Sequence, residues 1–165
     1  MRRALCLSAL LALVLPVVAT AGANAPGDGS LSVRDLDGTE GVLYVRARGT
    51  IVGRCDSCRF LLEDLADDAV PPVVAGAERA QDLDKDGLKE WWSGTDIRWK
   101  LVGSNFRLRI NRGRDVDLSV VGKGWGRVKG QFGLFSVNGA PFDLVFPEWT
   151  PFTLAEPAPA TTPSG

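Results

Sequence analysis

The sequence predicts an all-β protein, an antiparallel meander that closes as a β-sandwich or a small β-barrel. Three stretches between Asp96 and Phe146 carry the pattern of strands with one buried face. Apolar side chains occupy every second position of residues 97–101, 106–110 and 116–120, and mostly charged or polar side chains stand between them. Because side chains alternate between the two faces of a strand, each stretch can bury one face and leave the other in water.

Glycine-containing pairs separate these stretches and predict β-hairpins. Gly103-Ser104 suits a two-residue turn and Arg112-Gly113 a slightly longer one. Asn138-Gly139 is the strongest short hairpin signal, because both residues accept the positive φ angles of a type I′ turn. Several short strands with closely spaced turns are typical of sandwiches and barrels.

The N-terminus predicts a signal peptide over residues 1–21. Two arginines precede an apolar run from Ala4 to Val18, and Ala19-Thr20-Ala21 then provides a small-residue cleavage site. A membrane anchor is the alternative, but the run is shorter than the roughly 20 residues of a spanning helix. We therefore expect a secreted or cell-envelope protein (extracellular or periplasmic) with no transmembrane segment after cleavage.

Charge and composition exclude several functions. Cleavage removes Arg2 and Arg3 and no acidic residue, so the formal net charge moves from −1 to −3. A charge this small argues against general nucleic-acid binding. The chain has no histidine, which excludes Ser-His-Asp and Cys-His catalysis and histidine-ligated zinc.

The rest of the mature chain fits one domain over residues 22–154. Residues 41–53 alternate as a strand, whereas residues 59–65 fit either a short amphipathic helix or a returning strand, and the nearby prolines favour the strand. Prolines also restrict residues 147–152 to an edge strand or an extended segment. The tail at 155–165 consists mainly of Pro, Ala, Thr and Ser, and it lacks the apolar residues that would order it.

Several segments resemble a group of secreted bacterial β-rich proteins of uncharacterised function. They are residues 41–53, 72–78 and 120–124, and 135–139 followed by Pro141. The resemblance spans most of residues 40–152 and contains no chemical motif. It implies export and an all-β fold, and it provides no active site to transfer.

The Cys55-x-x-Cys58 pair has three interpretations. A structural disulfide across a turn is favoured, because turn ends lie within disulfide reach and exported proteins meet oxidising conditions. A redox-active pair would require a helix after the strand, in a fold that alternates strands and helices. A zinc site would require further ligands, and one pair without histidine does not supply them.

Residues 82–90 resemble the D-x-D-x-D-G calcium loops of EF-hands and of calcium-binding β-propeller blades. Asp82, Asp84 and Asp86 stand at positions 1, 3 and 5, Gly87 at position 6 and Glu90 at position 9. Carboxylates at these spacings can surround a calcium ion. The bidentate glutamate of EF-hands at position 12 is missing, so we expect weak affinity. The alternative is a solvated acidic loop.

Trp125 is the candidate ligand-binding residue. In sequence parity it shares a face with Arg127 and Lys129, which predicts exposure to solvent. Exposed aromatic side chains on a β scaffold can stack on sugars. Ordinary packing is the alternative. The surrounding glycines do not match a phosphate-binding loop, because Lys123 is followed by glycine and not by Ser or Thr.

Together these features predict a non-catalytic, secreted binding or envelope-associated module. Carbohydrate or another cell-envelope component is the expected partner, and calcium is the one candidate cofactor. A calcium-dependent carbohydrate-binding module and a thiol–disulfide oxidoreductase that uses Cys55 and Cys58 are the alternatives.

Overall fold

A computed structural model describes residues 27–66, 72–83, 85 and 89–155. The predicted signal peptide, and the tail after residue 155, lie outside these described residues. The described part is all-β and contains no helix. The predicted fold class is therefore confirmed, and residues 59–65 continue a strand up to Asp64, as favoured.

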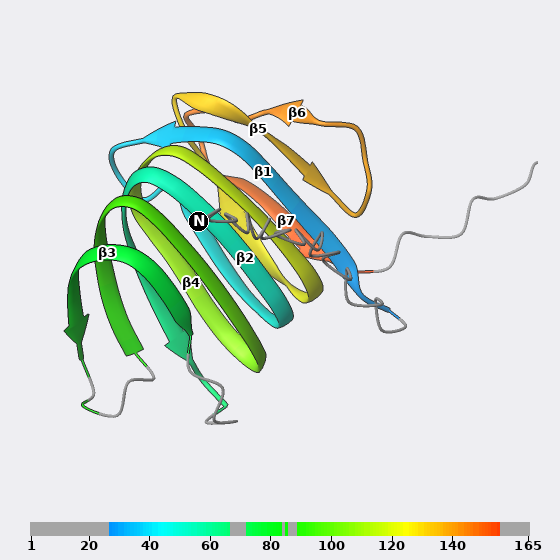
Figure 1. Cartoon of the computed structure of the whole chain (residues 1–165). Helices are drawn as coiled ribbons and strands as arrows, with labels where there is room; N and C mark the ends of the chain where they lie inside the picture. Colours follow the sequence, from blue (N-terminus) through cyan, green and yellow to red (C-terminus); the bar gives the residue numbers. More distant parts are fainter. Residues whose placement is uncertain (1–26, 67–71, 84, 86–88, 156–165) are drawn as a thin grey trace, which may run out of the picture.

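Seven strands form one antiparallel sheet (Figure 1). The sheet order is β2-β4-β1-β5-β6, with β3 and β7 both paired to β4, and the sheet is not closed into a barrel. The predicted meander order is wrong, because β1 lies between β4 and β5 and not beside β2. The strands are β1 (Gly29–Gly38), β2 (Leu43–Asp64), β3 (Val73–Asp82), β4 (Lys89–Val128), β5 (Phe132–Val137), β6 (Asp143–Leu144) and β7 (Thr150–Leu154).

The two long strands β2 and β4 wind around each other. Leu43 and Phe60, at opposite ends of β2, both pair with Ile110 of β4. The sheet therefore coils, and its ribbons bend over at both ends of each coil (Figure 1). Coiling gives one continuous sheet two facing layers. The first layer comprises residues 43–47, 60–64, 89–93, 106–110 and 123–128, and the second comprises residues 30–33, 49–54, 97–103 and 116–122.

Two of the three predicted hairpins are wrong. Gly103-Ser104 and Arg112-Gly113 both lie inside β4, and the chain passes from one layer to the other there without reversing. Glycine permits a sharp bend as readily as a turn. The third is confirmed: Asn138 and Gly139 have φ of 54° and 77°, and the Ala140 N–H donates to the Val137 carbonyl at 3.0 Å.

Glycines line one bend of the coil. Gly29 pairs with Gly122, Gly122 with Gly49, and Gly49 with Gly103, so four glycines lie side by side. Gly49 has a φ of 125°, and a side chain on it would overlap the Val121 carbonyl oxygen. We call this row the glycine bend. At Gly49 and Gly122 the neighbouring backbone approaches too closely for a side chain.

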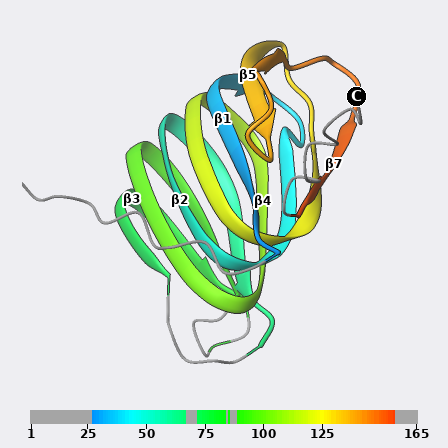
Figure 2. The same ribbon diagram turned by 90° about the vertical axis from the view of Figure 1, so that its right-hand side faces the viewer.

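The apolar faces of both layers meet in one core. Phe60 of the first layer and Trp99 of the second have ring centroids 4.6 Å apart, which confirms the predicted burial of Trp99. Gly53 leaves room for the Trp99 ring, which a side chain there would overlap. β3 and β7 lie at opposite ends of the coil (Figure 2). β7 contains Pro151 and pairs only with β4, as expected of an edge strand.

Candidate functional site

The outer face of the first layer gathers basic and aromatic side chains. Residues that pair across neighbouring strands point to the same side of a sheet. Tyr44 pairs with both Arg109 and Arg127, and Arg46 pairs with both Arg107 and Trp125. We call this surface the Arg–Trp face. It comprises Tyr44, Arg46, Arg48, Arg107, Arg109, Lys123, Trp125, Arg127, Lys129 and Trp149.

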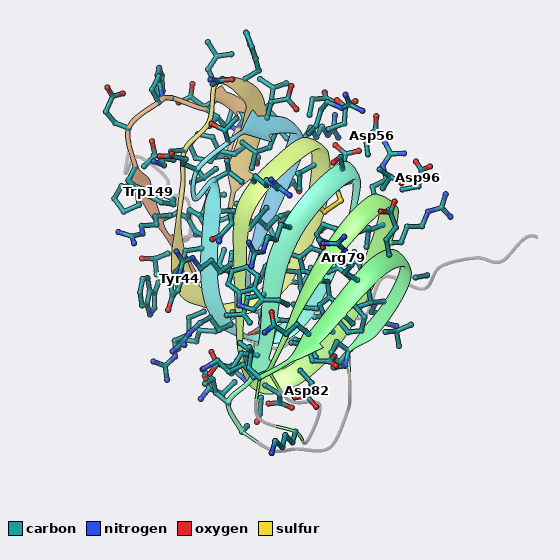
Figure 3. All side chains as sticks on the ribbon, turned by 90° about the vertical axis from the view of Figure 1, so that its left-hand side faces the viewer. Tyr44, Asp56, Arg79, Asp82, Asp96 and Trp149 are labelled. Carbon is teal, nitrogen blue, oxygen red and sulfur yellow. A yellow bond between two sulfur atoms is a disulfide. The ribbon has the colours of Figure 1, made fainter. Side chains whose placement is uncertain are left out.

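Rings and cations form a continuous chain of contacts on this face. The Trp125 and Tyr44 ring centroids are 5.1 Å apart. The Arg127 guanidinium lies 6.0 Å from the Tyr44 centroid and 4.5 Å from the Trp149 centroid. The Lys129 ammonium is 5.1 Å from the Trp149 ring. Figure 3 shows Tyr44 and Trp149 projecting from the same side of the molecule.

The pairing of β7 with β4 and a glycine at position 41 position the Trp149 ring on this face. β7 pairs Pro151 with Arg127 and Thr153 with Trp125, so the segment before it carries Trp149 onto the face. The Trp149 ring lies against Gly41, where a side chain would touch it. Trp125 keeps 50% of its surface exposed. Its predicted exposure is confirmed, and its role in ligand binding stays a prediction.

Most cations of the face are free of acidic partners. Glu63 is only 9% exposed and is bound by Arg107 at 2.6 Å and Lys89 at 3.5 Å. Arg48 pairs with Asp28 at 3.3 Å. Within the residues that the structure describes, five further cations of the face form no ion pair. These five are Arg46, Arg109, Lys123, Arg127 and Lys129.

A cavity of 250 Å³ opens at the centre of the face. Tyr44, Arg109, Arg127 and Trp149 line it together with Leu61. Leu61 points outward in register with Arg109, yet it is only 6% exposed, because larger side chains surround it. The cavity therefore offers an apolar floor, aromatic walls and two guanidinium groups that can donate hydrogen bonds to an anion.

The cysteine pair forms a disulfide inside the continuous strand β2, and not across a turn as expected. Cys55 and Cys58 have Cα atoms 6.1 Å apart and are each 3% exposed. Both contribute to the core. No helix follows the pair, since β2 continues to Asp64. Burial and the all-β setting favour a structural bond over a redox-active one.

The predicted calcium loop is only partly described. Asp82 and Glu90 pair across β3 and β4, and the Asp82 carboxylate accepts the Lys85 N–H at 2.8 Å. Asp84 and Asp86 lie outside the described residues. Among the residues that are described, no group of three or more acidic or cysteine side chains is arranged to hold a metal ion. Calcium binding by this loop stays a prediction.

Aspartates line the bend opposite the glycine bend. The register places Asp56 between Asp115 and Asp96, and Figure 3 marks Asp56 and Asp96 near each other. A hydrogen bond with Asp56, followed by repulsion from Asp56 and Asp37, raises the pKa of Asp115. We call this row the aspartate bend. It concentrates negative charge away from the Arg–Trp face.

The pKa of Asp117, next to this bend, is shifted in the opposite direction from that of Asp115. Burial alone would raise the pKa of its carboxyl group, but hydrogen bonds from two residues and the charge of Arg54 outweigh burial and hold that pKa below its usual value. The donors are the backbone N–H of Asp35 at 3.0 Å and the Arg54 guanidinium at 2.6 and 2.8 Å. This carboxylate is therefore ionised and engaged.

Comparisons with known proteins give no match: no protein-family model, no curated protein and no solved structure is similar to the chain. In the described part of the chain, no helix has the length and apolar character needed to cross a bilayer. The argument for function therefore depends on the chemistry of the Arg–Trp face.

Proposed function

We propose that this protein is an exported, non-catalytic binding module whose Arg–Trp face binds an acidic polysaccharide. The observation that carries the proposal is the unbroken chain of Trp125, Tyr44, Arg127, Trp149 and Lys129 on one outer face. Export follows the expected signal peptide, and the Cys55–Cys58 disulfide is compatible with an oxidising compartment.

The face suits both parts of such a ligand. Sugar rings present apolar C–H faces that stack on aromatic rings, and the half-exposed Trp125 offers one such ring. Carboxylates of uronic acids accept two N–H bonds from one guanidinium, and Arg109 and Arg127 stand on either side of Tyr44. A linear polymer that repeats a ring and a charge would match this chain of rings and cations.

A single-stranded nucleic acid also combines rings and negative charge, and it is the competing ligand. The polysaccharide is favoured because aspartates gather at one bend of the coil and the net charge is −1, so the positive charge is local to parts of the surface. A groove that follows a nucleic-acid backbone is usually much more positive than this molecule.

Tryptophan fluorescence provides the test. The exported protein is titrated with polygalacturonate, with neutral dextran and with a single-stranded oligonucleotide. We expect saturable binding of polygalacturonate and none of dextran. Trp125→Ala should weaken polygalacturonate binding at least fivefold, the effect of losing roughly 1 kcal/mol of stacking.

Arg98→Gln is the matched control, since Arg98 is exposed on the second layer, away from the Arg–Trp face. It should bind polygalacturonate like the wild type. Equal affinity of Trp125→Ala and wild type would contradict the proposal, and so would tighter binding of the oligonucleotide than of the polysaccharide.

A further inference from the structure

Three arginines form a second basic cluster on the first layer, next to the aspartate bend. Arg59 pairs with Arg112 on one side and with Ser93 on the other, and Ser93 pairs with Arg79 of β3. Neighbouring strands are about 4.8 Å apart, and paired residues point to the same side. The three guanidinium groups therefore share one face, on which Figure 3 marks Arg79.

A groove of 560 Å³ opens between these side chains. Trp91 forms part of its wall, and the Arg59 guanidinium lies 4.9 Å from the Trp91 ring centroid. Stacking of this kind restricts the guanidinium and orients its N–H donors. The groove is thus preorganised at Arg59 before any ligand enters.

The positive charge of the groove is not neutralised inside the protein. Arg59, Arg79 and Arg112 form no ion pair with any acid in the described ranges. Glu78 is the one acidic residue that lines the groove, and its carboxylate accepts a hydrogen bond from the Thr95 hydroxyl at 2.8 Å. Like charges at paired positions destabilise a sheet, and Arg59 and Arg112 are such a pair. A bound anion would reduce the repulsion between them.

We propose that this arginine groove binds a tetrahedral oxyanion, a phosphate or sulfate ester group. Guanidinium groups donate pairs of parallel N–H bonds to neighbouring oxygen atoms. Donors from three side chains can engage more oxygen atoms than the two of a carboxylate, and a phosphate or sulfate ester offers three. Ser93, between Arg59 and Arg79, adds a hydroxyl donor to the same row.

The groove and the Arg–Trp face are continuous. Leu61 pairs with Arg109 of the face and with Trp91 of the groove. One polymer can therefore occupy both sites, with sugar rings on Trp125 and an ester group at the arginines. This extension deepens the proposed function and depends on it, whereas the oxyanion site can be tested alone.

Thermal unfolding tests the oxyanion site with inorganic ions as probes. The melting temperature Tm of the full chain is measured in phosphate, sulfate and acetate at equal ionic strength. Ligand binding to the folded state raises Tm, so phosphate and sulfate should raise it by several degrees and acetate should not. Arg79→Gln combined with Arg112→Gln should abolish the rise, and Arg98→Gln combined with Lys100→Gln on the second layer should preserve it.

Equal shifts in acetate and phosphate would overturn the site, because they would indicate a general effect of ions. A phosphate shift that survives in Arg79→Gln with Arg112→Gln would also overturn it. Should the double variant not fold, as judged by circular dichroism, Arg79→Gln alone replaces it, since Arg79 is exposed on the edge strand β3. That variant should reduce the shift by at least half, and an undiminished shift contradicts the site.

Polymer binding separates the two proposals. Arg79→Gln with Arg112→Gln should lower the affinity for a sulfated polysaccharide at least tenfold and leave that for polygalacturonate unchanged. Trp125→Ala should weaken both polymers and preserve the phosphate shift. If the wild type binds neither polymer but still shows the phosphate-dependent rise in Tm, only the proposed function is contradicted. If the wild type binds polygalacturonate but shows no rise in Tm with phosphate, only the arginine groove is contradicted.

Discussion

At the scale of single residues, backbone geometry places carboxylates where electrostatics would not. Asp96 and Asp115 have φ of 50° and 49° at the aspartate bend, and Asp35 on the neighbouring strand β1 has a φ of 51°. Aspartate tolerates this left-handed conformation better than most residues, because its side chain bonds the local backbone. The bend therefore gains a feasible backbone conformation, and it carries the repulsion between Asp115 and Asp56 as a consequence.

Asp115→Asn should raise Tm at pH 7. The pKa of Asp115 is raised in the folded protein, so the folded state binds the proton more tightly than the unfolded chain does. The stabilisation from that proton is fully present below the ordinary aspartate pKa of about 4 and is lost as pH rises through the raised value. The Tm difference between variant and wild type should therefore shrink on acidification to about pH 4. Asparagine also tolerates the positive φ.

Asp117→Asn is the matched control with the opposite sign. The lowered pKa of Asp117 means that its ionised form stabilises the fold above the ordinary pKa, and that this stabilisation is lost as pH falls through the lowered value. Asp117→Asn should therefore lower Tm at pH 7. A Tm difference for Asp115→Asn that does not change with pH would show that the carboxylates do not interact.

At the scale of elements, the glycine bend is what allows β2 and β4 to remain continuous through two layers. Gly49 faces the carbonyl oxygen of Val121, and Gly122 faces that of Arg48. At each of these glycines, the carbonyl oxygen of the neighbouring strand occupies the space that a Cβ atom would need. The coil thus depends on backbone proximity at this row and not on hairpin turns.

Gly49→Ala should destabilise the protein by roughly 3 kcal/mol, which is large for a single added methyl group. The cost combines a φ of 125° with overlap of the Val121 carbonyl. Gly139→Ala is the matched control, since Gly139 has a φ of 77° with nothing within 4 Å of the added carbon. It should cost about 1 kcal/mol, from backbone conformation alone. Urea denaturation measures both, and equal costs would mean that the glycine bend tolerates a side chain.

The same elements show how far the sequence predicts this fold. Alternation identified the strand segments around Trp99, Leu108 and Leu118 correctly, because burial of one face is a local pattern. Gly103 and Gly113 were misread as hairpins, because a glycine at a bend and a glycine in a turn have the same local signature. Only the pairing of Ile110 with both Leu43 and Phe60 distinguishes the two, and such pairing is not local.

At the scale of the whole molecule, the distribution of charge matters more than its sum. The small net charge argues against general nucleic-acid binding. The coil nevertheless brings Arg46, Arg109 and Arg127 to one face and collects aspartates at a bend. The sequence showed that these arginines alternate with apolar residues. It did not show that their strands are neighbours, so the Arg–Trp face could not be predicted apart from the exposure of Trp125.

The salt dependence of binding tests whether this face acts as a local cation site. A polyanion that contacts free guanidinium groups releases its counterions, so the logarithm of affinity falls linearly with the logarithm of salt concentration. Arg127→Gln removes one unpaired cation of the face and should reduce the slope for polygalacturonate by roughly 0.7, the value for one contact to a single-stranded polyanion. Arg98→Gln removes the same charge from the second layer and should leave the slope unchanged. Equal changes in the two variants would show that the ligand responds to the total charge of the protein and not to the Arg–Trp face.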